Sequence, residues 1–130
     1  MNQEKKCGSE SCAVAVLGAS RKTERYSYMA LMLLREKGYP VYPVHPVFAE
    51  IEGIPVYSNL SDVPVILDTI TIYLSPANSA SLGTEIIKAK PRRVIFNPGA
   101  ENPELSAELK QLGIDTLNAC TLVLLKTGQF

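Results

Sequence analysis

Short apolar segments alternate along this chain with longer stretches in which apolar and polar residues are mixed. The first apolar segment, residues 13–17 (AVAVL), has the length of a strand and no alternation, which is typical of a strand buried on both faces. Further strands are predicted at residues 41–44, 69–74, 93–96 and 114–117. Between them, the apolar spacing predicts helices over residues 26–37, 76–89 and 103–112, with a closing helix over 120–126.

Several predicted boundaries carry residues that suit them. Gly38 and Gly113 follow predicted helices, and glycine commonly ends a helix. Ser75 is a good N-cap and Pro76 fits the first helical position after it. Residues 47–65 lack a long periodic pattern, so we expect an irregular crossover with a small strand and a single helical turn.

Strands that alternate with helices at this spacing predict a parallel sheet with helices on both faces. We therefore expect an α/β fold that is Rossmann-like and doubly wound, with about five parallel strands. The 130 residues, 46% of them hydrophobic, fit a single domain over residues 13–130, preceded by a flexible polar tail over residues 1–12. Ligands of such folds bind beyond the carboxyl ends of the strands, so function is expected in the loops there.

Charge and composition exclude several classes of protein. The 13 Lys and Arg residues balance 13 Asp and Glu residues, which argues against binding to nucleic acid. No apolar segment is long enough to cross a bilayer, and the N-terminal residues lack the apolar core of a secretion signal. Cys7, Cys12 and Cys120 are an odd number without a disulfide framework, which fits a reducing compartment. We therefore expect a cytoplasmic protein. A metal site is not expected, because Cys7 and Cys12 lack two further ligands nearby.

The loop after the first strand has the composition of a phosphate site. Ser20 supplies a hydroxyl, and the cations Arg21, Lys22 and Arg25 follow it within five residues. Arginine side chains bind phosphate oxygens in pairs, and a helix N-terminus attracts anions. The alternative is a solvated basic surface without a ligand. Cations oppose the dipole at a helix N-terminus, which favours the phosphate interpretation.

The same loop does not fit a dinucleotide. The dinucleotide fingerprint needs three glycines, whereas this loop has Gly18 alone. Binding of NAD also needs an acidic residue at the end of the second strand, where this chain has Val44, His45 and Pro46. Two independent requirements for NAD are therefore missing.

Several loops together resemble the small stand-alone CoA-binding proteins, which are similar to the N-terminal CoA-binding domain of the succinyl-CoA synthetase alpha subunit. The motifs that carry the resemblance are GASRKTERYSY, GYPVYPVHP, EIEGIPVYSNLSDVP, the strand end at Leu74, NPGAEN and NAC. They match in order and spacing over residues 13–124. The resemblance implies a Rossmann-like domain that holds coenzyme A at the C-terminal edge of its sheet.

The resemblance also implies a set of binding residues at the strand ends. They are Gly18, Ala19, Ser20, Arg21 and Arg25 for the phosphates, Val44, His45, Pro46 and Tyr57 for the nucleotide pocket, and Ser75, Pro76, Asn97, Gly99, Asn118 and Cys120 in the remaining loops. The family usually has Asn where this chain has His45. Tyr57 either forms a wall of the adenine pocket or belongs to the core.

Two residues invite a catalytic interpretation, and for both we prefer another role. A phosphorylated His45 would need a partner active site from a domain that this chain lacks. Cys120, at the predicted start of the last helix, could form a disulfide with the thiol of CoA, but a small buried packing residue is the simpler interpretation. No catalytic residue is expected.

The sequence thus favours a non-catalytic module that binds coenzyme A or an acyl-CoA as a carrier, a sensor or the partner of an acyl-CoA enzyme. An NAD(P)-dependent oxidoreductase, or a CoA ligase or transferase subunit that needs another chain, is the enzymatic alternative. A regulatory protein with a vestigial pocket is a third. The acyl group and the oligomeric state are left open.

Overall fold

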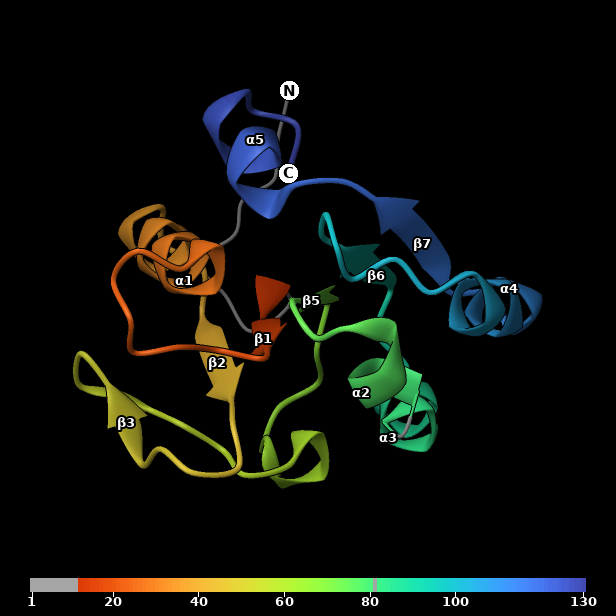
Figure 1. The fold of residues 1–130 in the computed structure, drawn as a ribbon, viewed down its shortest axis with the longest axis horizontal. Coiled ribbons are helices and arrows are strands. Elements are labelled where there is room, and N and C mark those ends of the chain that lie inside the picture. The colour runs from red at the N-terminus through yellow and green to blue at the C-terminus, as the bar shows by residue number, and fades with distance from the viewer. Residues whose placement is uncertain (1–11, 81) are drawn as a thin grey trace.

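The protein is described here by a computed structural model, which covers residues 12–80 and 82–130. Its main sheet has five parallel strands in the order β2-β1-β5-β6-β7, with helices on both faces (Figure 1). The strands are β1 (Val14–Leu17), β2 (Val41–Val44), β5 (Thr69–Ile72), β6 (Arg93–Phe96) and β7 (Asp115–Asn118). The predicted doubly wound, Rossmann-like α/β fold is confirmed. Except for Cys12, the expected tail over residues 1–12 lies outside the described residues.

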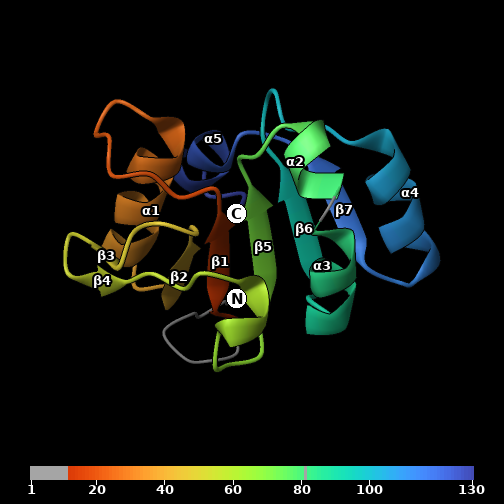
Figure 2. The same cartoon turned by 60° about the horizontal axis from the view of Figure 1, so that its bottom comes forward.

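The order in which strands are added to the sheet reverses between β1 and β5. From β1 the chain passes through α1 (Tyr26–Glu36) to β2 at one edge, and then returns past β1 to β5 on the other side. It continues outward through α2 (Pro76–Ala80) and α3 (Gly83–Ala89) to β6, through α4 (Pro103–Gln111) to β7, and ends with α5 (Thr121–Lys126). Such a reversal opens a crevice at the carboxyl ends of the strands, which all lie at one edge of the sheet (Figure 2).

Residues of β1 enter two separate cores. Ala15 and Leu17 pack in the core that contains residues of α3 and α4, whereas Val14 and Val16 pack with residues of α1 and α5. All four are at most 1% exposed. Each buried aliphatic side chain of the size of valine or leucine contributes about 1.5–3 kcal/mol. The apolar run without alternation therefore follows from burial on both faces, as predicted.

The helix expected to run without a break over residues 76–89 is two helices, and that prediction was wrong. Leu82 has φ −103° and ψ 3°, outside the helical range, and α3 begins after it at Gly83. A Cβ atom at Gly83 would lie 3.3 Å from Cδ1 of Leu105 in α4. The start of α3 therefore lies close to α4, a tertiary contact that the spacing of apolar residues does not reveal.

The crossover between β2 and β5 is a hairpin followed by a helical turn. Strands β3 (Glu50–Ile51) and β4 (Ile54–Pro55) pair antiparallel, where one small strand was expected, and η2 (Leu60–Asp62) is the predicted single turn. The hairpin is attached to α1, because the Tyr28 hydroxyl donates to Glu52 Oε2 (2.7 Å) and Arg35 Nη1 donates to the Glu52 carbonyl (3.1 Å). This attachment fixes the segment that leads from β2 past the carboxyl edge.

The cysteines correct one expectation. Cys12 is disulfide-bonded, whereas Cys120 is a free thiol. An odd number of cysteines leaves room for one pair, so the count did not exclude a disulfide. Within residues 12–80 and 82–130, no helix has the length and apolar character needed to cross a membrane.

Candidate functional site at the carboxyl edge of the sheet

The turn after β1 can be formed only by glycine without strain. Gly18 has φ +89°, and a Cβ atom there would lie 3.0 Å from Cδ2 of Leu74. The backbone N–H groups of Gly18 and Ala19 both donate to the Val44 carbonyl, at 3.2 and 3.3 Å. The turn is therefore held against the end of β2, at the predicted site.

Cations surround the N-terminus of α1, which follows this turn. The Ser20 hydroxyl accepts a hydrogen bond from the Lys22 backbone N–H (3.0 Å), and Arg25 occupies the N-cap position without a side-chain cap. The first turn of this 11-residue helix contains no acidic residue. Because the first N–H groups of a helix lack partners within the helix, they and the Arg21, Lys22 and Arg25 side chains favour an anion here.

Two adjoining cavities open at this edge. One, of about 490 Å³, is lined by Gly18, Ala19, Ser20, Lys22, Arg25, Tyr26, Ser27, His45, Phe48, Tyr73 and Leu74. The other, of about 400 Å³, is lined by Leu17, Gly18, Val44, His45, Pro46, Ser58, Asn59, Leu60, Leu74, Asn78 and Leu82. Gly18, His45 and Leu74 line both. The cationic cavity and the second, less charged cavity thus meet at the switch point of the sheet.

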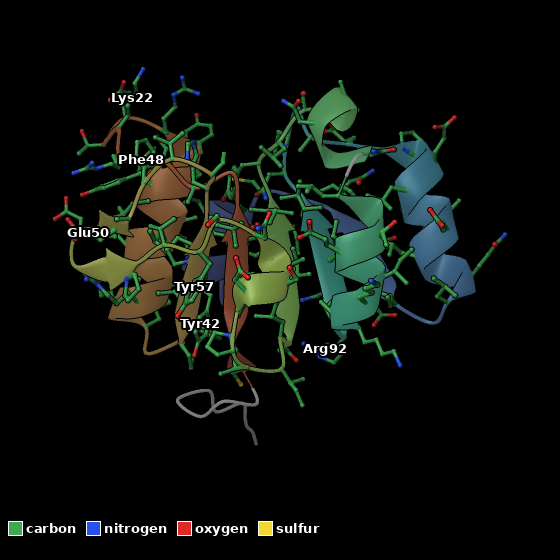
Figure 3. The ribbon with its side chains drawn as sticks, turned by 90° about the horizontal axis from the view of Figure 1, so that it is seen from below. Lys22, Tyr42, Phe48, Glu50, Tyr57 and Arg92 are labelled. Carbon is green, nitrogen blue, oxygen red and sulfur yellow. The ribbon has the colours of Figure 1, made fainter. Side chains whose placement is uncertain are left out.

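His45 is fixed at the junction of the two cavities. Its ring stacks on that of Phe48, with 4.3 Å between centroids and 18° between planes. Its Nδ1 atom accepts a hydrogen bond from the Val47 backbone N–H (3.1 Å). The Arg21 guanidinium lies 5.4 Å from the Phe48 ring centroid, and Phe48 and Lys22 lie at the same end of the molecule (Figure 3).

The structure gathers about half of the predicted site residues around the cavities. Seven line them, namely Gly18, Ala19, Ser20, Arg25, Val44, His45 and Pro46. Arg21 approaches them through its contact with Phe48. The remaining ones do not line either cavity, namely Tyr57, Ser75, Pro76, Asn97, Gly99, Asn118 and Cys120. The Tyr57 ring packs against Tyr42, 6.0 Å away between centroids, and the two are neighbours in Figure 3.

Asn97 is committed to the fold. Its side chain is buried and donates to Thr71 Oγ1 (2.6 Å) and to the Ile72 carbonyl (3.0 Å), while its Oδ1 accepts from the Thr121 backbone N–H (2.8 Å). The Thr71 and Thr121 hydroxyls bond to each other (2.7 Å). Asn97 therefore fastens the first residue of α5 to the sheet and so sets the position of Cys120, the N-cap residue of α5.

Tyr73 was not predicted as a site residue, yet it lines the cationic cavity. Its hydroxyl is buried without a hydrogen-bond partner among the described residues, since the hydroxyls of Thr71 and Thr121 are bonded to each other. Burial raises the pKa of Tyr73 to about 12, although the nearby Thr121 and Thr71 hydroxyls lower it in part. Tyr73 therefore stays neutral and presents an aromatic wall.

Sequence reasoning also missed Phe48, Asn59 and Asn78. Phe48 lies in the irregular crossover, where no periodic pattern indicates which way a side chain points. Asn59 and Asn78 lie near strand ends, and this position in the sequence could have indicated them as candidate site residues. Among the described residues, no cluster of His, Cys, Asp and Glu could hold a metal ion.

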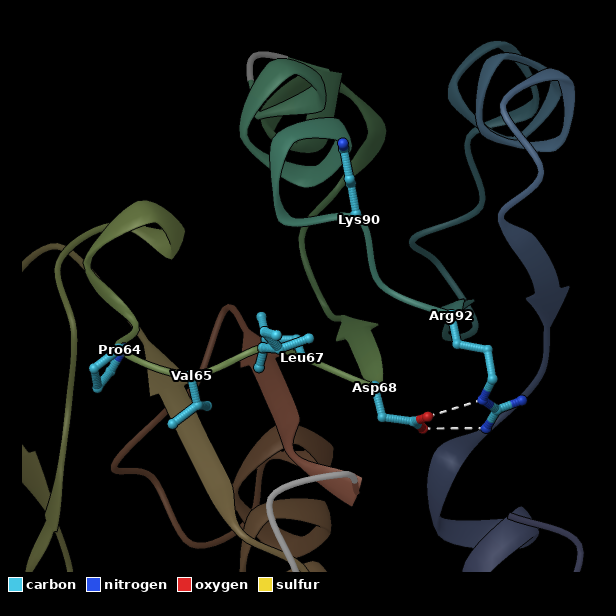
Figure 4. A pocket seen from close by; sticks show the side chains of 7 residues that line it. Pro64, Val65, Leu67, Asp68, Lys90 and Arg92 are labelled. Atoms are coloured by element: carbon cyan, nitrogen blue, oxygen red, sulfur yellow. Dashed lines mark hydrogen bonds and ion pairs between the residues drawn. The ribbon is translucent and has the colours of Figure 1, made fainter.

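A larger cavity, of about 690 Å³, lies at the opposite edge of the sheet (Figure 4). Asp68 and Arg92, which both line this cavity, form an ion pair. Arg92 Nε and Nη2 donate to the two carboxylate oxygens of Asp68 at 2.8 and 3.1 Å. Ligands of doubly wound folds bind at the carboxyl ends of the strands, whereas this cavity lies at their amino ends. We therefore assign the candidate site to the carboxyl edge.

Replacing Asp68 with asparagine tests the structural role of that ion pair. Burial alone would raise the pKa of Asp68, but hydrogen bonds from Arg92 and Thr69 and the charges of Arg92 and Arg93 lower it below its ordinary value of 3.8. Such a carboxyl stabilises the fold above the unfolded-state pKa, and the stabilisation is lost as pH falls through the folded-state pKa. We expect Asp68→Asn to lower the free energy of unfolding at neutral pH.

The difference from the parent protein should disappear as the pH falls below 3.8 and through the lowered pKa, as measured by urea unfolding across this range. Ligand binding at the carboxyl edge should be unchanged in the same variant. A stability difference that persisted below both pKa values would show that packing, rather than charge, is what Asp68 contributes.

The fold and this edge define a nucleotide-binding α/β domain of the Rossmann-like class. Over residues 13–126 the chain matches the CoA-binding domain family, and it belongs to that family.

Individual proteins and structures are similar to this chain. A crystal structure of an uncharacterized protein is 40% identical, with a TM-score of 0.85, and the alignment covers 92% of this chain and 98% of that one. The uncharacterized protein YneT of Bacillus subtilis (strain 168) is 24% identical over 100 residues, 77% of this chain and 74% of that protein. An acetyl-coenzyme A synthetase of Ca. Korarchaeum cryptofilum is 26% identical with a TM-score of 0.70, and the match covers 82% of this chain but 25% of the synthetase.

Proposed function

We propose that this protein binds coenzyme A or an acyl-CoA across the two adjoining cavities, with the phosphates on the turn after β1. The observation that carries this proposal is the set of cations, Arg21, Lys22 and Arg25, around the N-terminus of α1, whose first turn lacks acidic residues. A ligand with several phosphates would bind these cations through charge-assisted hydrogen bonds. CoA has three phosphates, and family membership supports it as the ligand.

The second cavity suits the uncharged part of the same ligand. Its walls combine apolar side chains with the amides of Asn59 and Asn78, and no Lys, Arg, Asp or Glu lines it. Cys120, a half-buried free thiol ahead of α5, lines neither cavity, so the contact with the pantetheine end that the family resemblance implies would lie beyond them. We infer a non-catalytic carrier, sensor or partner of an acyl-CoA enzyme.

Calorimetric titration with CoA, dephospho-CoA and NAD tests the proposal. We expect CoA to bind more tightly than dephospho-CoA, which lacks one phosphate, and NAD to bind much more weakly than either. Lys22→Gln with Arg25→Gln removes two cations that line the phosphate cavity. A hydrogen bond to a charged group contributes about 1.5–3 kcal/mol, so the double variant should lose at least about tenfold in CoA affinity.

Lys88→Gln is the matched control, because Lys88 is an exposed cation of α3 that lines neither cavity. Its affinity for CoA should equal that of the parent protein. Equal binding of NAD and CoA, or an unchanged CoA affinity in the Lys22→Gln/Arg25→Gln variant, would contradict the proposed site.

A further inference from the structure

The two edges of the main sheet differ. At the β2 edge, Tyr57, two residues after β4, forms a parallel bridge with Val44: its backbone N–H donates to the Pro43 carbonyl and its carbonyl accepts from the His45 N–H, both at 3.0 Å. At the other edge, β7 pairs with β6 alone among the described residues. β7 and the adjacent helix α4 form one end of the molecule (Figure 2). One edge is covered and the other offers a strand for pairing.

Two residues of β7 have backbone N–H and C=O groups that point away from the sheet. The Asp115 N–H donates to the Arg92 carbonyl and the Ala119 N–H to the Phe96 carbonyl, both at 3.1 Å. In a parallel ladder, alternate residues of a strand bond to the same neighbour. Leu117 therefore also faces β6 with its backbone, and the N–H and C=O groups of Thr116 and Asn118 point away from the sheet.

We propose that two copies of this chain pair through β7, antiparallel about a two-fold axis at Leu117. The axis sets Thr116 of each copy opposite Asn118 of the other, so that both pairs exchange two backbone hydrogen bonds. Leu117 then lies opposite its own counterpart in a non-hydrogen-bonded pair, with Cα atoms about 4.5 Å apart. The same patch serves both copies, as two-fold symmetry requires, and the result is a continuous ten-stranded sheet.

Charge permits this pairing. β7 has one ionisable residue, Asp115, whose charge acts on Arg92 and Arg93 of its own chain and which would face the uncharged Ala119 of the second copy. Charged lysines, prolines and bulges commonly protect edge strands, and β7 has neither lysine nor proline. Leu117 is 39% exposed, an apolar side chain at the proposed axis.

The helix beside β7 lies on one face of the proposed dimer. The Ser106 hydroxyl of α4 is bonded to that of Thr116 (2.8 Å), so this side of α4 stands over β7. A two-fold axis perpendicular to the sheet keeps both α4 helices on the same face. Pro103 and Lys110 are exposed and lie one turn from Ser106 on the helix surface, so each copy brings one cation to this side.

Sedimentation of the full chain tests the dimer. The parent protein should have twice the chain mass of 14.2 kDa, and Leu117→Lys should have the mass of one chain, because two lysines would meet at the axis. Ile66→Lys is the control: Ile66 is an 84% exposed apolar residue ahead of β5, and this variant should stay dimeric. CoA binding should persist in Leu117→Lys. A monomeric parent protein, or a dimeric Leu117→Lys variant, would overturn the proposal.

Cysteine cross-linking tests the register. A Cα separation of about 4.5 Å lies within the range that a disulfide can bridge. After mild oxidation with diamide, Leu117→Cys should give a covalent dimer on a non-reducing gel. Ile66→Cys and the parent protein, treated in parallel, should not. Failure of Leu117→Cys to cross-link in a protein that sediments as a dimer would show that the copies meet elsewhere.

Discussion

Gly18→Val is expected to lower the free energy of unfolding by about 2–4 kcal/mol and to reduce CoA affinity at least tenfold. A β-branched residue is strained at the φ of +89° that Gly18 adopts, and its Cβ would lie 3.0 Å from Leu74 Cδ2 and 3.4 Å from the Tyr73 carbonyl carbon. Leu74 and Tyr73 line the cationic cavity, so relief of the crowding would deform the site itself. Urea unfolding and calorimetric CoA titration measure the two effects.

Gly38→Val is the matched control. Gly38 has nearly the same backbone conformation, with φ +92°, but no atom lies within 4 Å of a Cβ built on it. It should therefore show only the conformational strain, about 1–2 kcal/mol, and normal CoA affinity. If both variants lost the same stability and bound CoA equally well, the close approach of Leu74 to Gly18 would have no role in the site.

Asn97→Ala is expected to cost about 2–4 kcal/mol of stability, since the buried partners of the amide lose their hydrogen bonds together. The variant leaves the Thr121 backbone N–H at the start of α5 without its acceptor and removes the amide donor from Thr71 Oγ1 and the Ile72 carbonyl. The loss should appear as a lower urea midpoint with an unchanged slope, which indicates a change of stability within a two-state transition.

Asn118→Ala provides the comparison for Asn97→Ala. Asn118 is an exposed asparagine at the end of the neighbouring strand β7, and substitutions at such positions usually change stability by no more than about 0.5 kcal/mol. Equal losses in the two variants would mean that the bonds of Asn97 do not fasten α5.

These residues have different roles at the carboxyl edge. Gly18 and the cations after it form the surface that would receive phosphates, His45 and Phe48 fix the junction between the cavities, and Asn97 holds α5 in place. Both donors of the Asn97 amide and one acceptor site of its oxygen are used within the fold, so a ligand could bond to its side chain only through the second acceptor site unless these bonds rearrange. The sequence motif thus contains both ligand-facing and structural positions.

The fold was largely predictable because its signals are local. The apolar run through Val14 and Val16, the glycine stop at Gly38 and the Ser75-Pro76 helix start each depend on a few neighbouring residues. The division of the helix before β6 was not predictable. The non-helical backbone of Leu82 and the close approach of Gly83 to Leu105 are features that the apolar spacing does not contain.

The candidate site was predictable only in part. The cationic turn could be read directly, since Ser20, Lys22 and Arg25 are close together in the chain. Phe48 and Tyr73 could not, because the crossover has no periodicity and Tyr73 falls inside the strand predicted over residues 69–74, whereas β5 ends at Ile72. The family resemblance implies that Asn97 contacts the ligand, and its three buried hydrogen bonds add a structural role that the sequence did not indicate.

The sequence by itself determined the class of fold, the edge of the sheet that carries the candidate site and the cations of the turn after β1. These depend on strand and helix periods and on short motifs, which are local properties. The tertiary structure alone decided which loop residues line the cavities, that Asn97 fastens α5, and that β7 is the uncovered edge of the sheet. Those outcomes depend on contacts between residues far apart in the chain, and a linear pattern contains no distance between them.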